Sequence, residues 1–243
     1  MLRLLKSYPR TRPELPAAYR AIYVEHYRKN RTSTGLLQRA VLGLEAWMHR
    51  RVAARATEGG SILEIGAGTL NHVPYERGCA GYVVVEPFRE LWQDSPHQET
   101  VDRIHASLTD VPDSSRFDRI LSVAVLEHLE SLPEIVARCG LLLKSGGIFQ
   151  AGIPSEGGLL WGMSWRCTTA ISFYLTRRLR YEYIMRHEHL NNAREIEAVL
   201  RHFFRGVKVD RFPGPSLHSS FYTYLEAADP NLERCRAYLG RPD

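Results

Sequence analysis

The stretch "SILEIGAGTLNHVPYE", residues 61–76, decides the fold. A short apolar run ends near the acid Glu64 and is followed by Gly66 and Gly68, two residues apart. Glycines after a first strand let the backbone approach a ligand closely and turn sharply into a helix. The dinucleotide fingerprint G-x-G-x-x-G has a third glycine, but Asn71 stands there in this chain. The glycine pattern alone is therefore weak evidence for a nucleotide site.

The chain on the C-terminal side of this stretch predicts a buried sheet. Its short apolar runs are "SILEIG", "GYVVVEP", "VDRIHA", "FDRILSVAV" and "GIFQAGIP", and longer mixed segments separate them. Such Val, Ile and Leu runs are typical of parallel strands that are buried on both faces. Near the end, "GVKVDRF" and "SFYTYLEA" are too close for a parallel crossover, which indicates an antiparallel hairpin. We predict an α/β fold with a doubly wound, mostly parallel seven-stranded sheet and a C-terminal antiparallel hairpin.

Two segments lie outside this pattern. Residues 1–58 predict a helical N-terminal extension, with one helix from about Pro16 and a second from about Gly35 to Ala56. Residues 155–190 interrupt the alternation after the fifth strand and predict a helical insertion. The predicted organisation is therefore an N-terminal cap, 1–58, followed by a Rossmann-like domain, 59–243, that carries the insertion.

Composition sets further limits on the kind of protein. The N-terminal 58 residues hold 12 Lys and Arg against 4 Asp and Glu, whereas residues 59–243 hold 20 against 23. This local excess suits an anionic partner, or simply a solvated helix face. The four cysteines form no C-x-x-C pair, and no apolar run reaches the length of a membrane span. With no signal peptide in the first residues, the sequence predicts a cytoplasmic protein with reduced thiols.

Further motifs strengthen the nucleotide interpretation. Glu86 ends "VVVEP", where a carboxylate can accept hydrogen bonds from both hydroxyls of a ribose. "SVAVLEHL" and "LLLKSGGIFQAGIP" follow in order. Across residues 60–154 this set resembles the class I S-adenosylmethionine-dependent methyltransferases, especially the branch with E/DxGxGxG after the first strand and "EHL" after the fourth. One position departs from that pattern, because Leu70 replaces the third glycine.

The resemblance implies S-adenosyl-L-methionine as the cofactor and also implies the residues that hold it. They are Glu64, Gly66, Ala67 and Gly68 for the methionine moiety, Glu86 for the ribose, Pro87 and Phe88 against the adenine, Ala106, Ser107 and Leu108 at the adenine edge, and Ser122, Val123 and Ala124 beneath the sulfonium.

Candidate catalytic residues follow from the chemistry of methyl transfer. The enzyme must mainly align the acceptor with the activated methyl group, but a hydroxyl acceptor also needs a base, and histidine is the usual choice. His189 is the first candidate, followed by His128 in "LEHL" and by His187, which would share a side with His189 if the backbone were extended. The alternative for the region of His189 is helix capping by Asn191 or Asn192. No metal site is predicted.

The acceptor is the least determined partner. The insertion combines aromatic residues with arginines and follows the fifth strand, where the ligand edge of the sheet lies. We therefore expect it to form a lid over the acceptor. We expect transfer to an oxygen or nitrogen of a small molecule, with a sugar or glycan precursor as one candidate and an anionic or lipid-linked acceptor at a membrane surface as another. An RNA methyltransferase, an NAD-dependent oxidoreductase and a non-catalytic cofactor-binding protein remain as alternatives. The absence of a recognisable RNA module argues against nucleic acid.

Overall fold

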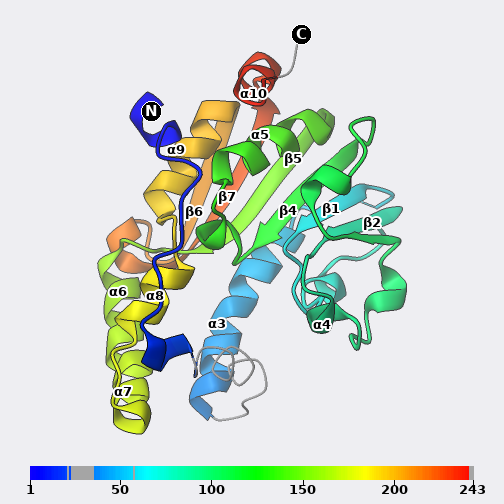
Figure 1. Ribbon diagram of the computed structural model, residues 1–243. Coiled ribbons are helices and arrows are strands. Elements are labelled where there is room, and N and C mark those ends of the chain that lie inside the picture. Colours follow the sequence, from blue (N-terminus) through cyan, green and yellow to red (C-terminus); the bar gives the residue numbers. More distant parts are fainter. Residues whose placement is uncertain (21, 23–35, 57, 241–243) are drawn as a thin grey trace.

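A central sheet of seven strands organises the molecule (Figure 1). The computed structural model describes residues 1–20, 22, 36–56 and 58–240. The strand order is β3-β2-β1-β4-β5-β7-β6. Its members are β1 (Ser61–Ile65), β2 (Gly81–Val85), β3 (Arg103–His105), β4 (Phe117–Val123), β5 (Leu143–Pro154), β6 (Phe204–Pro213) and β7 (Ser220–Pro230). The pairs among β1 to β5 are parallel, and β7 runs antiparallel to β5 and β6, which confirms the predicted sheet and hairpin.

The strand order places a ligand site. The chain builds outward from β1 to β2 and β3, and then returns to place β4 and β5 on the other side of β1. In open α/β sheets, ligands bind in the crevice at the carboxyl ends of the strands, where the order reverses. The loops after β1 and β4 meet at this point.

Helices cover both faces of the sheet. Those the structure describes are α1 (Leu2–Leu5), α3 (Leu36–Ala53), α4 (Arg89–Trp92), α5 (Leu132–Leu142), α6 (Leu159–Trp165), α7 (Ile171–Arg177), α8 (Glu182–Glu188), α9 (Ala193–Phe203) and α10 (Leu232–Tyr238). Because neighbouring strand residues point to opposite faces, Leu63 joins the core beneath α5 and α9, whereas Ile62 joins the core beneath α3.

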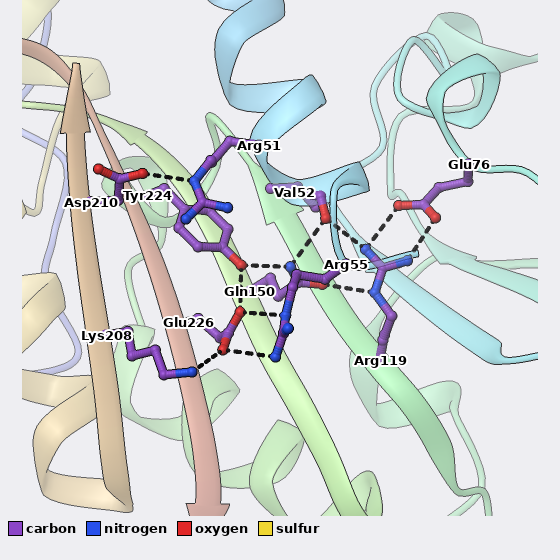
Figure 2. A network of polar contacts seen from close by, with 10 residues as sticks. All are labelled: Arg51, Val52, Arg55, Glu76, Arg119, Gln150, Lys208, Asp210, Tyr224 and Glu226. Atoms are coloured by element: carbon purple, nitrogen blue, oxygen red, sulfur yellow. Dashed lines mark hydrogen bonds and ion pairs between the residues drawn. The ribbon is translucent and has the colours of Figure 1, made fainter. Parts of the chain in front are cut away.

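A buried polar network fixes the C-terminal end of α3 on the sheet (Figure 2). Arg119 of β4 and Gln150 of β5 donate to the Val52 carbonyl at 2.9 and 3.1 Å, and Arg119 also donates to both oxygens of Glu76, at 2.6 and 2.9 Å. These contacts satisfy one of the carbonyls that a helix leaves without an internal partner. The predicted helix from Gly35 to Ala56 therefore ends close to its expected position, with Met48 and Val52 buried as its apolar stripe requires.

A non-helical stretch precedes the predicted first helix, whose described residues 17–20 are helical. Residues 8–16 contain no helix and form a strap that Figure 1 shows in blue, running from beside α9 to α8. Tyr8 donates to Asn191 Oδ1 at 2.7 Å, and Arg10 forms an ion pair with Glu195 at 2.6 Å. At least one N-terminal cation, Arg10, therefore holds the strap against α9. Tyr23, His26 and Tyr27 of the predicted first helix lie outside the described residues.

The predicted insertion is helical, as expected. It contains α6, a π-helical turn at Arg166–Ala170, α7 and α8. Leu15 and Tyr19 of the N-terminal segment share a small apolar cluster with Phe173, Tyr181 and Ile184 of the insertion. The two added segments therefore pack on each other as well as beside the sheet.

Candidate functional site

The loop after β1 turns through three left-handed residues. Gly66, Gly68 and Leu70 have φ values of 73°, 54° and 63°. A Cβ on Gly66 would lie 2.6 Å from the side chain of Val125, so this position needs glycine for space as well as for backbone conformation. Leu70, which departs from the family motif, accepts a conformation that is uncommon for leucine, and its side chain is fully buried in the core beneath α3.

Glu86 links this loop to the end of β2. Its side chain is 5% exposed, and its two oxygens accept hydrogen bonds from the backbone N–H groups of Gly68, at 2.7 Å, and Phe88, at 3.0 Å. An ionised carboxylate has about four lone-pair sites, so two sites stay available to further donors. The carboxylate thus joins the loop after β1 to the loop after β2 at the sheet edge.

The other predicted cofactor residues line the same edge of the sheet. Pro87 and Phe88 are exposed after β2, and Ala106, Ser107 and Leu108 follow β3, where Ser107 caps a short 3₁₀ turn. Ala106 is exposed, whereas Leu108 is 3% exposed and belongs to the core beneath α5 and α9.

Residues from β4 complete this edge, next to β1. Ser122 is buried and donates to the Ile65 carbonyl at 3.1 Å, and Val123 is largely buried. Ala124 has a φ of 55°, is exposed, and donates its N–H to the Gly152 carbonyl at 2.8 Å. β4 therefore ends in a strained, accessible residue beside the loop after β1.

Glu64 is placed differently from Glu86. It is 1% exposed, and its Oε2 accepts a hydrogen bond from the Tyr82 hydroxyl at 2.6 Å. Burial raises the pKa of the Glu64 carboxyl. This side chain therefore packs beneath the loop. A separate surface hollow of about 780 Å³, between α3 and residues such as Asn71 and Tyr75, has none of the predicted cofactor residues in its lining.

A second group of polar side chains lies around His189. His189 Nδ1 is 2.5 Å from Oε2 of Glu156, which follows β5, and the His189 ring meets the ring of His128 edge-on with centroids 4.8 Å apart. His128 Nδ1 donates to the Glu188 carbonyl at 2.9 Å, and its Nε2 is 3.8 Å from Oε1 of Glu127. We call Glu127, His128, Glu156 and His189 the histidine cluster.

The electrostatics of the histidine cluster depend on its carboxylates. Burial disfavours the protonated form of His189, but the hydrogen bond to Glu156 and the charges of Glu156, Glu127 and Glu188 outweigh it, so the pKa of His189 is raised. Glu127 is 2% exposed, and burial raises its pKa. Its Oε2 has no hydrogen-bond partner among the described residues. A buried acceptor without a partner is costly, so a donor from a bound molecule would be stabilised there.

The structure brings two of the three predicted histidines together and places the third elsewhere. His128 and His189 come together, whereas His187 lies in α8 and its Nδ1 hydrogen-bonds to the Pro13 carbonyl. The expectation that His187 and His189 lie on one extended segment is wrong, because residues 182–188 are helical. Asn192 caps α9 in a capping box with Glu195, so the predicted cap exists beside His189 and does not include it.

Sequence reasoning missed both carboxylates of the histidine cluster. Glu127 stands inside the "LEHL" motif, which drew attention only to its histidine, and Glu156 is the first acid after the fifth strand. The available signal was an acid in the first few residues after a strand, two residues after β5 for Glu156 and four after β4 for Glu127. Within residues 1–20, 36–56 and 58–240, no group of three or more His, Cys, Asp or Glu side chains is placed to hold a metal ion.

Comparison with known proteins identifies the family. The family model described as "Methyltransferase domain" matches residues 38–203, which is more than half of the chain. The strand order, with its antiparallel C-terminal strands, matches the Rossmann-like fold of methyltransferases. The chain belongs to the methyltransferase-domain family: it is an S-adenosylmethionine-dependent methyltransferase, and S-adenosylmethionine is its cofactor.

Solved structures share the fold at low sequence identity. A Thermotoga maritima SAM-dependent methyltransferase, described as a possible histamine N-methyltransferase, has a TM-score of 0.57 and 16% identity over 87% of this chain and 97% of its own. The N-methyltransferase NodS from Bradyrhizobium japonicum, in complex with S-adenosylhomocysteine, has a TM-score of 0.57 and 15% identity over 89% and 100%. No curated protein matches the chain.

Proposed function

We propose that this methyltransferase acts on an oxygen or nitrogen atom of a small molecule, with His189 as the base that removes the acceptor's proton. The observation that carries this proposal is the 2.5 Å contact between His189 Nδ1 and Glu156 Oε2, after the carboxyl end of β5. A catalytic base oriented by a carboxylate is a recurring arrangement in enzymes that activate a nucleophile.

The cofactor would lie across the carboxyl ends of β1, β2 and β4. Gly66 and Gly68 give the close backbone approach, Glu86 offers acceptors for ribose hydroxyls, and Ala124 borders the crevice beside β1. When bound, S-adenosylmethionine supplies a methyl group that is already activated by the positive sulfonium. The residues of the chain then have to align the acceptor and manage its proton.

The proton would move to Nε2 of His189. If Nδ1 carries a proton, it donates to Glu156, which fixes the tautomer and leaves the Nε2 lone pair available as a base. The negative charge of Glu156 then stabilises the imidazolium that forms. Glu127 offers its unpartnered oxygen to a hydroxyl or amine of the acceptor.

The charge of the histidine cluster favours one kind of reacting group. Glu127, Glu156 and Glu188 all act on His189, so the reacting atom would belong to a hydrogen-bond donor such as a hydroxyl or an amine. A sugar hydroxyl fits this description. These features argue against RNA as the acceptor, because its phosphates would meet carboxylates near the reacting atom.

The proposal is tested by following the methyl group. The protein is incubated with tritium-labelled S-adenosylmethionine and with small-molecule fractions of a bacterial extract, and nucleotide sugars are included as defined acceptors. We expect label in the small-molecule fraction and none in RNA. Label that is recovered only in a ribonuclease-sensitive fraction would overturn the acceptor class.

A further inference from the structure

The helical segment 159–177 exposes apolar side chains to solvent. Leu159, Met163, Ile171, Tyr174 and Leu175 each expose 50% to 65% of their surface. The segment comprises α6, the π-helical turn and α7. Trp161 of α6 packs against Tyr222 of β7, and Figure 1 shows α7 continuing from there to the lower left corner of the molecule. Large contiguous apolar patches on a soluble protein mark interaction sites.

Four of these side chains repeat at regular spacing along one helical segment. Leu159, Met163, Ile171 and Leu175 are separated by multiples of four residues. In a regular α-helix with 3.6 residues per turn, this spacing would rotate the stripe steadily around the helix. The wider turn at Arg166–Ala170 counteracts that rotation, because a π-helix takes more residues per turn. The exposed apolar side chains are therefore kept on a shared face, which we call the α6–α7 face.

Arginines supply the charges along this segment, and the first acid after it, Glu182, forms an ion pair with Arg180 at 2.6 Å. Between residues 157 and 181 the chain has four arginines, Arg166, Arg177, Arg178 and Arg180, and no Asp or Glu. All four arginines are exposed. The Arg166 guanidinium lies over the Trp165 ring at 4.4 Å, and Arg178 lies over Tyr174 at 5.8 Å, so cationic and aromatic groups alternate along the segment.

We propose that the α6–α7 face docks on an anionic lipid bilayer, with its apolar side chains in the headgroup region and its arginines on lipid phosphates. An amphipathic helix with leucine and aromatic residues on one side and arginines beside them is the form that binds in the plane of the interface. Each basic residue near an anionic surface contributes to binding, and the contribution falls with salt. Within the described residues, no helix is long and apolar enough to cross a membrane, so the contact is peripheral. This inference does not depend on the acceptor or on the base.

Vesicle co-sedimentation of the full chain tests the proposal. The protein is mixed with vesicles of phosphatidylcholine alone or of phosphatidylcholine with 30% phosphatidylglycerol, at low and high salt. We expect binding to the anionic vesicles that weakens with salt. The variant Ile171→Glu/Leu175→Glu should bind at least about tenfold more weakly. Leu232→Glu, on α10, is the matched control because Leu232 is also exposed, and it should bind like the parent.

A second variant tests the contribution of the arginines to membrane binding. Two further measurements check that the variants are folded and whether a second copy of the chain binds this face instead. Arg166→Glu/Arg178→Glu should also lose about tenfold or more on anionic vesicles. Calorimetric titration with S-adenosylhomocysteine shows that each variant is folded. Equal binding of the parent and both variants, or no binding to anionic vesicles, overturns the proposal. Light scattering that shows a dimer, dissociated by the Ile171/Leu175 variant, would assign this face to a second copy of the chain instead.

Discussion

His189 Nδ1 and Glu156 Oε2 lie 2.5 Å apart, although the two residues are 33 positions apart in the sequence, with the helices of the insertion between them. Glu156 is positioned by the end of β5, and His189 by the end of α8, whose last turn accepts the His189 N–H at the Met185 carbonyl. The insertion therefore leaves the sheet and returns to the same edge. This return places His189 beside Glu156 at the carboxyl end of β5, the contact on which the proposed role of His189 as a base depends.

The first prediction concerns pH. Because the pKa of His189 is raised above 6.5, turnover should rise with pH through an inflection above 6.5. Glu156→Gln should move that inflection to lower pH and slow turnover. The ion pair also contributes stability, which is present below pH 6.5 and is lost as the pH rises through the raised pKa. A pH–rate profile for the parent and the variant checks both effects, and superimposable profiles would remove Glu156 from the mechanism.

The second prediction concerns Glu86. Glu86→Ala should weaken S-adenosylhomocysteine binding by about 1.5–3 kcal/mol, because hydrogen bonds to a charged group are lost. It should also lower the free energy of unfolding, since Gly68 and Phe88 lose their acceptor. Glu86→Gln is the control that keeps the shape and one acceptor oxygen. Calorimetry and urea unfolding measure the two effects, and unchanged affinity in a folded Ala variant would contradict the ribose role.

The third prediction concerns the network in Figure 2. Arg119→Met should reduce the free energy of unfolding by about 3–5 kcal/mol, because buried Glu76 loses its charged partner. The double variant Arg119→Met/Glu76→Gln should recover part of this loss, since it leaves no unpaired charge. Urea unfolding of the three proteins checks this. If the double variant is no more stable than Arg119→Met, Arg119 and Glu76 do not act as a pair.

The fourth prediction concerns acid stability. Burial, with the nearby His72, lowers the pKa of His49 to about 3. The unfolded chain therefore binds a proton at about pH 6.5 that the folded protein rejects, so stability should fall as the pH drops from 6.5 toward 3, by at most about 1.4 kcal/mol per pH unit. His49→Gln should flatten this dependence relative to the parent. Identical slopes for the two proteins in denaturant titrations would contradict the assignment.

The sheet could be predicted from the sequence because its information is local. β1, β2 and β4 are short apolar runs bounded by turn residues, and the short connection before Ser220 leaves only an antiparallel hairpin. The motifs also located the turn after β1, where Gly66 and Gly68 have positive φ values, whereas the cofactor roles of these residues stay a prediction. The start of α9 was predictable for the same reason, because Asn192 and Glu195 have the three-residue spacing of a capping box.

The histidine cluster could be predicted only in part, because its contacts are not local. Nothing near His189 in sequence names Glu156 as its partner, and the alternation of His187 with His189 suggested an extended segment that α8 excludes. The strap was missed for a similar reason. Arg10 and Arg12 resemble a solvated basic tail, yet Arg10 pairs with Glu195, and Arg12 donates to the His128 carbonyl at 2.8 Å.

The most direct test of the central claim compares methyl transfer and cofactor binding in His189→Ala. Tritium-labelled S-adenosylmethionine reports transfer to the small-molecule acceptor, and calorimetry with S-adenosylhomocysteine reports the cofactor site. The account predicts that His189→Ala binds S-adenosylhomocysteine like the parent. Its rate of label transfer should fall at least about a hundredfold. Full transfer by His189→Ala across pH 6 to 9 would contradict the account.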